Sequence, residues 1–190
     1  MPLFTQAALA MWWRIDESDR PEFEHWHSSE HLPERLGVPG FRRGTRWSAA
    51  GGEGAYFVMY EIDSLALLDS EEYLARVNQP TPWSAKVMKG FRNMVRSRCR
   101  ISASHGGGIG GALATVRFAP QPGKEAALRE WLQRDLLPQV PTQPGLASAH
   151  LLENVAPAGQ ALTAEQKLRG GDAMADWAVL VGGYSGASVS

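Results

Sequence analysis

Two histidines and a glutamate lie close together in the segment His27-Ser-Ser-Glu30-His31. If this segment is helical, a rotation of about 100° per residue places these three side chains on one face and His25 on the other. An imidazole titrates near neutral pH, so it can donate or accept a proton, and a neighbouring carboxylate can orient it. We therefore expect His31 to be a general acid or base, Glu30 to orient it or share its proton, and His27 to be a second donor or relay.

The same segment matches H-x-x-E-H, the signature of the inverted zinc peptidases. Histidines four residues apart on a helix can bind one zinc ion. However, Pro33 is expected to end the helix within two residues, and no long helix downstream offers an obvious third ligand. We expect neither a metallopeptidase nor a cofactor, and a bound metal of another kind is the alternative.

The chain contains this segment twice. Residues Trp26–Phe41 align without gaps with Trp131–Leu146 at a constant shift of 105 residues. The strand-like segments Ala8–Ile15 and Leu113–Pro120 align at the same shift. This agreement in register indicates a tandem duplication, and both tryptophans are expected to be buried. The matching pairs are Trp26 with Trp131, Glu30 with Asp135, Leu32-Pro33 with Leu137-Pro138, and Pro39-Gly40 with Pro144-Gly145.

The second copy carries leucines where the first carries histidines. His27 corresponds to Leu132, and His31 corresponds to Leu136. Leucines on this helix face would pack against a sheet, whereas burying an unpaired imidazole costs a few kcal/mol. The sequence therefore predicts a polar pocket between helix and sheet in the first half and a closed apolar core in the second.

Each half is predicted to begin with a strand, a helix and two further strands, from period-2 alternation and helix-forming composition. The first half continues with helical segments at 64–77 and 83–95 and a last strand, which completes the ferredoxin-like order β-α-β-β-α-β. The second half stops after its third strand, so it is either truncated at Ser190 or naturally incomplete. We expect an α+β fold of tandem ferredoxin-like repeats, with units at 1–105 and 112–190 joined by a glycine-rich linker at 106–111.

Composition limits the expected partners. The net charge of −1 argues against nucleic acid or an anionic membrane surface. No apolar run reaches the ~20 residues of a membrane span, and the N-terminus lacks the basic region of a signal peptide. Cys99 is the single cysteine and is expected to be a buried thiol. We expect a cytoplasmic protein that binds a small hydrophobic or aromatic ligand, and a homodimer if an uncovered sheet edge needs a partner.

The stretch "WHSSEHLPERLGVPGFRRGTRW", followed by "YFVMYEIDSLALLDSEEYL", resembles the EthD-like branch of the dimeric α+β barrel superfamily. The resemblance implies that two ferredoxin-like sheets face each other as a barrel, here within one chain. It also implies a cavity between sheet and helices for small, often aromatic or lactone-type molecules. The positions that match the motif of this branch are His27, Glu30, His31 and Arg35, although many relatives have a tyrosine in place of His27.

Relatives in this superfamily include cofactor-independent monooxygenases, muconolactone-type isomerases and polyketide cyclases, so the fold does not decide the reaction. We expect an isomerase, cyclase or lyase that acts by proton transfer on an aromatic, lactone or polyketide-like compound. Arg35, with Arg46 or Tyr60, would hold a carboxylate or enolate. Trp12, together with Trp13 and Trp47, would form aromatic walls, with core packing as the alternative for at least one of them. The alternatives are a non-catalytic ligand-binding or stress-response protein and a cofactor-independent monooxygenase.

Overall fold

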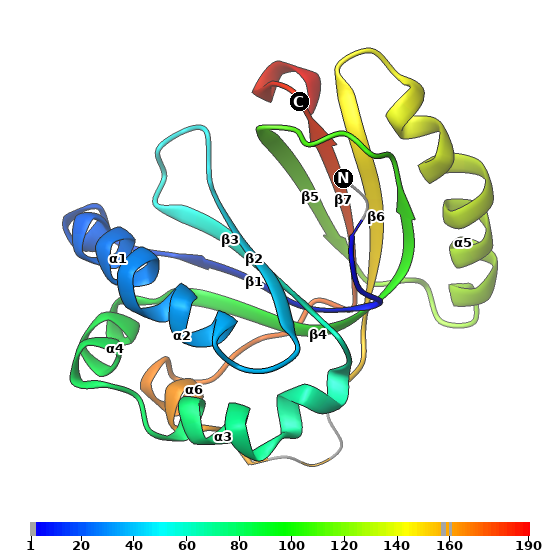
Figure 1. The fold of residues 1–190 in the computed structure, drawn as a ribbon. Coiled ribbons are helices and arrows are strands. Elements are labelled where there is room, and N and C mark those ends of the chain that lie inside the picture. Colours follow the sequence, from blue (N-terminus) through cyan, green and yellow to red (C-terminus); the bar gives the residue numbers. More distant parts are fainter. Residues whose placement is uncertain (1–2, 157–158, 160) are drawn as a thin grey trace.

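The structure is a computed structural model that describes residues 3–156, 159 and 161–190. In this part of the chain, seven strands form a single sheet in the order β2-β3-β1-β4-β6-β7-β5 (Figure 1). Every ladder between neighbouring strands is antiparallel. The α+β class predicted from the sequence is therefore confirmed. The strands are β1 (Ala7–Arg14), β2 (Phe41–Ser48), β3 (Ala55–Ile62), β4 (Arg92–His105), β5 (Ala112–Phe118), β6 (Leu146–Asn154) and β7 (Trp177–Gly183).

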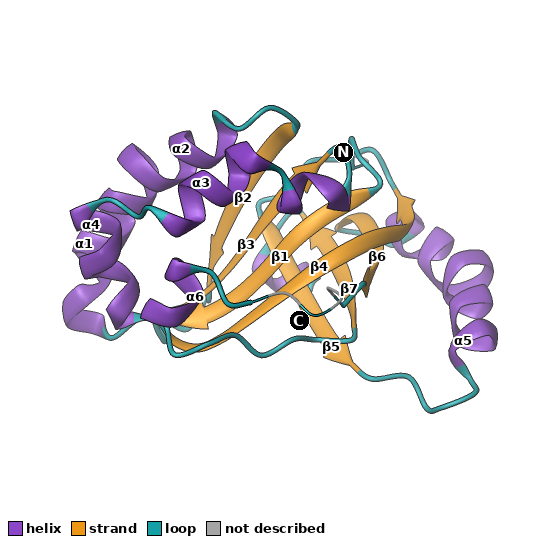
Figure 2. Cartoon of the chain, turned by 90° about the horizontal axis from the view of Figure 1, so that it is seen from below, coloured by secondary structure: helices purple, strands orange, loops and turns teal. Residues whose placement is uncertain are grey.

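The helices form two groups. Helices α1 to α4 and α6 gather on one side of the molecule, whereas α5 lies at the other end (Figure 2). A π-helical turn follows α1 at His27–His31, and another follows α5 at Leu132–Leu136. The helices are α1 (Arg20–Trp26), α2 (Leu32–Leu36), α3 (Glu71–Asn78), α4 (Pro82–Val87), α5 (Glu125–Trp131) and α6 (Ala164–Leu168).

The two faces of the sheet contribute to different cores. On β1, Leu9 and Trp13 belong to the core beneath α1 and α2, whereas Trp12 belongs to a core on the opposite face. This second core contains residues of both halves of the chain. In addition, Nε1 of Trp12 donates a hydrogen bond to Oγ1 of Thr115 on β5 at 3.1 Å. The inner face of β1–β4 therefore lies opposite the inner face of β5–β7, inside a curled sheet (Figure 1).

Strand β4 joins the two halves. It runs for 14 residues and pairs with β1 along its first part and with β6 along its second part. The sequence predicted two separate sheets, and the structure has one because of this β4–β6 ladder. The sequence also predicted a helix as far as Val95, but α4 ends at Val87 and Arg92 already pairs with β1. Pairing with a neighbouring strand has outweighed the local helical pattern.

The helix that carries His27 does not end at Pro33, so this part of the prediction is wrong. The N–H of Leu32 donates to the carbonyl of His27, which closes the π-helical turn, and α2 then continues to Leu36. Pro33 lies in the first turn of α2, where its missing N–H removes little hydrogen bonding. The Leu-Pro pair marks the end of a π-helical turn here.

The predicted burial of the paired tryptophans is confirmed for Trp26 and wrong for Trp131. Trp26 is fully buried, whereas 47% of Trp131 is exposed. Trp26 is covered by α4, where Oγ of Ser84 accepts a hydrogen bond from its Nε1 at 3.1 Å. In the described part of the second half, no helix takes the place of α4 beside α5. Trp131 therefore stays at the surface, and Leu132 supplies the buried contact instead.

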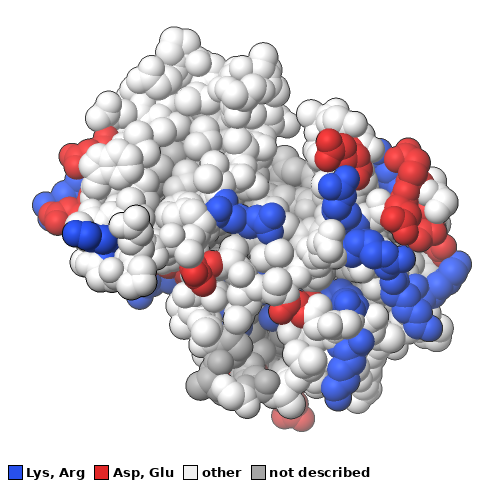
Figure 3. All heavy atoms as spheres, turned by 180° about the vertical axis from the view of Figure 1, so that it is seen from behind, with Lys and Arg blue, Asp and Glu red and all other residues white. Residues whose placement is uncertain are grey.

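The surface carries charges of both signs. On the face shown in Figure 3, acidic and basic side chains are interspersed and leave a broad stretch without charge. Exposed ion pairs such as Lys86–Glu22, at 2.6 Å, are screened by solvent and contribute little to stability. The buried cores therefore account for most of the stability. Cys99 lies in the core between the two halves, as predicted. Among the described residues, no helix is both long and apolar enough to cross a membrane.

Candidate functional site

His27 and His31 lie between the helices and the sheet of the first half. Their ring centroids are 5.6 Å apart, and only 2% of His27 and 7% of His31 is exposed. His31 stacks on the ring of Trp26 with centroids 4.4 Å apart, and His27 packs against Phe23 at 5.6 Å. His25 points away from them and is exposed, as predicted. The helix therefore places two imidazoles in an interface that is otherwise aromatic.

Several polar atoms in this interface have no hydrogen-bond partner among the described residues. They are both ring nitrogens of His27, Nδ1 of His31, Nε1 of Trp13 and the hydroxyl of Tyr60. Leaving a buried donor or acceptor unpaired costs about 1–3 kcal/mol, so native proteins contain few of them. The two imidazoles, the indole and the phenol form a cluster, which we name the imidazole cluster. The two imidazoles lie close enough together for one polar molecule to reach both, with Trp13 beside His27 and Tyr60 four register positions further along the ladder of β1 and β3.

Burial keeps the imidazoles uncharged. The pKa of His27 is lowered to about 3, mainly because burial disfavours the charged ring and also because Arg46 is close. The pKa of His31 is lowered well below its usual range by burial, with further repulsion from Arg35, His27 and Arg169. Burial likewise raises the pKa of Tyr60. At neutral pH the cluster therefore contains neutral imidazoles and a protonated phenol, which can form hydrogen bonds with a bound molecule.

Glu30 does not reach His31. Its Oε1 accepts hydrogen bonds from Nε1 of Trp26 at 3.1 Å, from Oγ1 of Thr81 at 2.7 Å and from Oγ of Ser84 at 3.1 Å. The carboxylate therefore ties the helix to the start of α4. Because His31 stacks on Trp26, Glu30 can influence the imidazole only through that ring. Among the described residues, no group of three or more histidine, cysteine or acidic side chains could hold a metal ion.

Arg35 is buried and already paired. Its Nη2 donates to Glu165 on α6, its Nη1 donates to Glu34 at 3.1 Å, and its guanidinium lies 6.0 Å from the ring centre of Tyr73. Only 2% of Arg35 is exposed. The charge that the sequence assigned to a substrate is therefore balanced inside the protein. It still lies close enough to His31 to lower the pKa of that imidazole.

Two of the predicted strand residues reach the helix side, and one does not. Tyr60 points toward the helices, and Arg46 does too, since its Nη1 donates to the carbonyl of Glu24 at 3.3 Å. Trp12 lies on the opposite face of the sheet, in the core between the two halves. The prediction that Trp12 forms a wall of this pocket is therefore wrong. Alternate residues of a strand point to opposite faces, so Trp13 occupies that wall instead.

Sequence reasoning missed the contribution of α6. No role was assigned to this helix from the sequence, and the helix begins with a capping box of Thr163 and Gln166. However, Glu165 on this helix is buried against Arg35, and Arg169 lies near His31. Glu165 and Arg169 are four residues apart, which places them on one side of a helix. This spacing was the feature of the sequence that could have indicated a buried role for α6.

Comparison with known proteins gives a likeness of fold. No protein-family model matches the chain, and no curated protein sequence matches it. A solved structure from Fusobacterium nucleatum subsp. nucleatum ATCC 25586, named a "putative monooxygenase", is similar with a TM-score of 0.59 and 10% identity, over 97% of this chain and 79% of that one. A structure of the same name from Lactobacillus acidophilus NCFM is similar with a TM-score of 0.59 and 7% identity, over 96% of this chain and 79% of that one. The structure of an anthrone oxidase-like protein is similar with a TM-score of 0.58 and 12% identity, over 99% of this chain and 77% of that one.

At these identities the likeness concerns the fold alone. The seven-stranded antiparallel sheet with its helices is consistent with the dimeric α+β barrel fold of these structures. The expected dimeric α+β barrel fold is therefore supported, and the chain covers more than three quarters of each similar structure.

Proposed function

We propose that this chain is a small-molecule enzyme whose imidazole cluster transfers protons on an aromatic, lactone or polyketide-like substrate. The observation that carries this proposal is the set of unpaired buried polar atoms on His27, His31, Tyr60 and Trp13. A fold that tolerates several unpaired groups in one place incurs a cost, and functional sites are where such costs are usually found. A substrate bound there would supply the missing partners.

The second half supports this interpretation by contrast. We propose that residues 1–105 and 112–190 are tandem ferredoxin-like units related to the EthD-like branch. In support, α1 and α5 begin 105 residues apart, and so do the two π-helical turns. Because the π-helical turn occurs in both halves, it belongs to the repeat. The imidazoles occur in the first half alone, where function requires them. Strands β2 and β5 end the sheet, and their outer edges are where a second copy would pair.

The chemistry begins with a neutral imidazole as base. His31 or His27 takes a proton from an acidic carbon or hydroxyl of the substrate, which leaves a delocalised enolate or phenolate. Either Nε1 of Trp13, whose ring lies 6.5 Å from that of His27, or the hydroxyl of Tyr60 is free to donate a hydrogen bond to the developing negative charge. The nearby positive charge of Arg46 favours the same anion. Return of the proton to another atom of the substrate completes an isomerisation or a cyclisation.

Access to the cluster requires a covering side chain to move, because both imidazoles are nearly fully buried. Leu32 is the best placed. It follows His31 in the sequence, is half-buried, and packs over Gly44 of β2, where an added Cβ would lie 2.5 Å from its Cδ1 and 2.9 Å from Cε1 of Tyr60. Rotation of Leu32 would open the cluster toward this strand at the end of the sheet.

A second reaction has its own support. Two of the similar structures carry a monooxygenase name, and the third carries an anthrone oxidase-like name. A cofactor-independent oxygenation would start from the same deprotonated substrate, which would then react with O₂. For anthrone, one O₂ would be consumed, and the products would be the quinone and water. Proton abstraction is therefore the step common to both candidate reactions.

Anthrone is the probe that tests the proposal. We expect the purified chain to accelerate exchange of its acidic methylene protons with D₂O, followed by NMR under nitrogen. His31→Leu should slow this exchange by about 10²–10⁴-fold, the usual contribution of a general base. The matched control, His25→Leu, alters an exposed imidazole on the other side of the same helix and should leave the rate unchanged.

The same experiment separates the alternatives. Exchange without O₂ uptake in air supports an isomerase or cyclase, and exchange with stoichiometric O₂ uptake supports an oxygenase. Binding of anthrone without any acceleration of exchange would indicate a non-catalytic binding protein. Exchange that His31→Leu does not affect would contradict the proposed site.

A further inference from the structure

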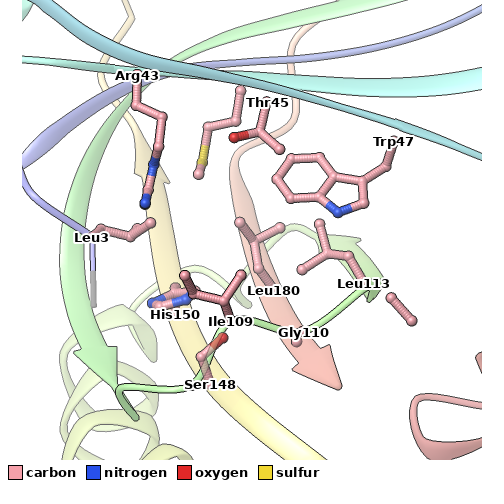
Figure 4. Close-up of a pocket in the computed structure, with 14 residues that line it drawn as sticks. Leu3, Arg43, Thr45, Trp47, Ile109, Gly110, Leu113, Ser148, His150 and Leu180 are labelled. Carbon is pink, nitrogen blue, oxygen red and sulfur yellow. The ribbon is translucent and has the colours of Figure 1, made fainter. Parts of the chain in front are cut away.

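A second cavity lies on the opposite face of the sheet, between the two halves of the chain. It measures about 150 Å³ and is enclosed by β2 and β3 on one side and by β5, β6 and β7 on the other (Figure 4). The linker residues Gly108 to Gly110 cover one side of it. None of the residues of the imidazole cluster lines this cavity. A molecule bound here would therefore be separated from the imidazole cluster by the sheet.

One end of the cavity is polar. Figure 4 shows Arg43 and His150 at this end, with Leu3 between them in this view and the hydroxyl of Ser148 below His150. Nε of Arg43 donates to the buried carboxylate of Glu61, and its guanidinium lies 4.6 Å from the ring centre of Phe4. These contacts fix the guanidinium, whose two Nη atoms donate to no other described residue. They are free to bind an acceptor.

The hydrogen bonds of His150 indicate that it is also a donor toward the cavity. Oγ of Ser104 accepts from the N–H of Leu3 at 3.2 Å and lies 2.9 Å from Nδ1 of His150. Ser104 can donate its proton to Nδ1 while it accepts from Leu3, and in this tautomer the proton of the neutral ring lies on Nε2. Burial lowers the pKa of His150 to about 4, so the ring is neutral at neutral pH. Arg43, His150 and Ser148 thus offer donors to one acceptor-rich group.

The other end of the cavity is apolar. Trp47 and Leu113 lie there in Figure 4, with Leu180 between the two ends, and Met59 completes the wall. A cavity of about 150 Å³ lined by apolar side chains is large enough for a benzene-sized group. Aromatic rings also gain from stacking on an indole. The shape and the lining therefore suit a single ring that carries one polar substituent.

We propose that this cavity binds a single-ring aromatic carboxylate, with its ring between Trp47 and Leu180 and its carboxylate toward Arg43 and His150. A carboxylate has only acceptors, which matches the free donors at the polar end. The acidic group nearest to Arg43, Glu61, is already bonded to the guanidinium and to the N–H of Phe4. This site is independent of the proposed proton-transfer site, because the two lie on opposite faces of the sheet.

Titration calorimetry with benzoate and with benzyl alcohol tests this proposal. The two probes share the ring, but only benzoate carries the charge. Benzoate should bind at least about tenfold more tightly, as expected for hydrogen bonds to a charged group. His150→Leu keeps the approximate volume and removes the donor, so it should weaken benzoate about tenfold and benzyl alcohol much less. NMR should place the benzoate-induced shifts on the methyl groups of Leu113 and Leu180.

Two further variants complete the test. His31→Leu alters the imidazole cluster and should leave benzoate affinity unchanged. Ser148→Ala removes a single hydroxyl and should weaken benzoate binding even if His150→Leu fails to fold. Equal affinity for the two probes would overturn the proposal. So would methyl shifts confined to the helix side of the sheet, or benzoate binding that neither His150→Leu nor Ser148→Ala weakens.

Discussion

Replacing both imidazoles by the leucines of the second half, His27→Leu with His31→Leu, should increase the stability of the protein. Three ring nitrogens of these side chains are buried without a partner. Each unpaired group costs about 1–3 kcal/mol, and the double change removes all of them together with two rings that must stay neutral. The leucines should fit the aromatic interface less well than the imidazoles, which should offset about 1–3 kcal/mol of this gain. Three such groups together outweigh that loss, so we expect the free energy of unfolding to rise, by up to several kcal/mol.

Urea denaturation of the double variant and the unchanged protein measures this quantity by linear extrapolation, provided that the slopes agree. The reciprocal variant, Leu132→His, is the matched control. Leu132 is 4% exposed in the second half, so an imidazole there should cost about 2–4 kcal/mol. If the double leucine variant is less stable than the unchanged protein by more than about 1 kcal/mol, the imidazoles have partners in the protein. This result would refute the reasoning.

Three further predictions follow from buried charges and exposed rings. Arg35→Met should cost up to about 3–5 kcal/mol because the buried Glu165 loses its hydrogen-bonded partner and keeps only the ion pair with Arg169 at 3.9 Å, and adding Glu165→Leu should restore most of that loss in a double-mutant cycle. Trp131→Ala should cost less than about 1.5 kcal/mol because 47% of the ring is exposed, whereas Trp26→Ala should cost about 3–5 kcal/mol in the same melts. The pKa of His27 is about 6.5 in the unfolded chain and about 3 in the folded chain. Between these pH values only the unfolded chain binds a proton at His27, so the stability should fall as the pH falls from about 6.5 toward about 3. The slope should reach about 1.4 kcal/mol per pH unit for each such histidine, and His27→Leu should reduce it.

The sequence predicted the site better than it predicted its surroundings. The comparison of His27 and His31 with Leu132 and Leu136 predicted that they lie on a helix face that packs on the sheet, and both histidines are buried there. This succeeds because helical periodicity is local. The direction of Glu30 could not be predicted, because it depends on Thr81 and Ser84 of α4, more than fifty residues away.

Other errors have the same physical origin. Trp12 and Trp13 are adjacent and equally aromatic, so the choice of face depends on the pairing of β1 with its neighbours. The cavity around Arg43 and His150 is formed by strands from both halves of the chain. No local spacing in the sequence connects these two residues, so the cavity could not be predicted. Pro33 indicated a helix end, yet the π-helical turn before it allows the helix to continue.

The ring nitrogen resonances of the histidines, recorded by ¹⁵N NMR while anthrone is added, test the central claim most directly. The imidazole cluster should provide the hydrogen bonds to the bound probe, so the resonances of His27 and His31 should shift strongly and saturate together. The exposed His25 should not shift. If anthrone binds or its protons exchange while the resonances of His27 and His31 stay in place, the proposed proton-transfer site is wrong.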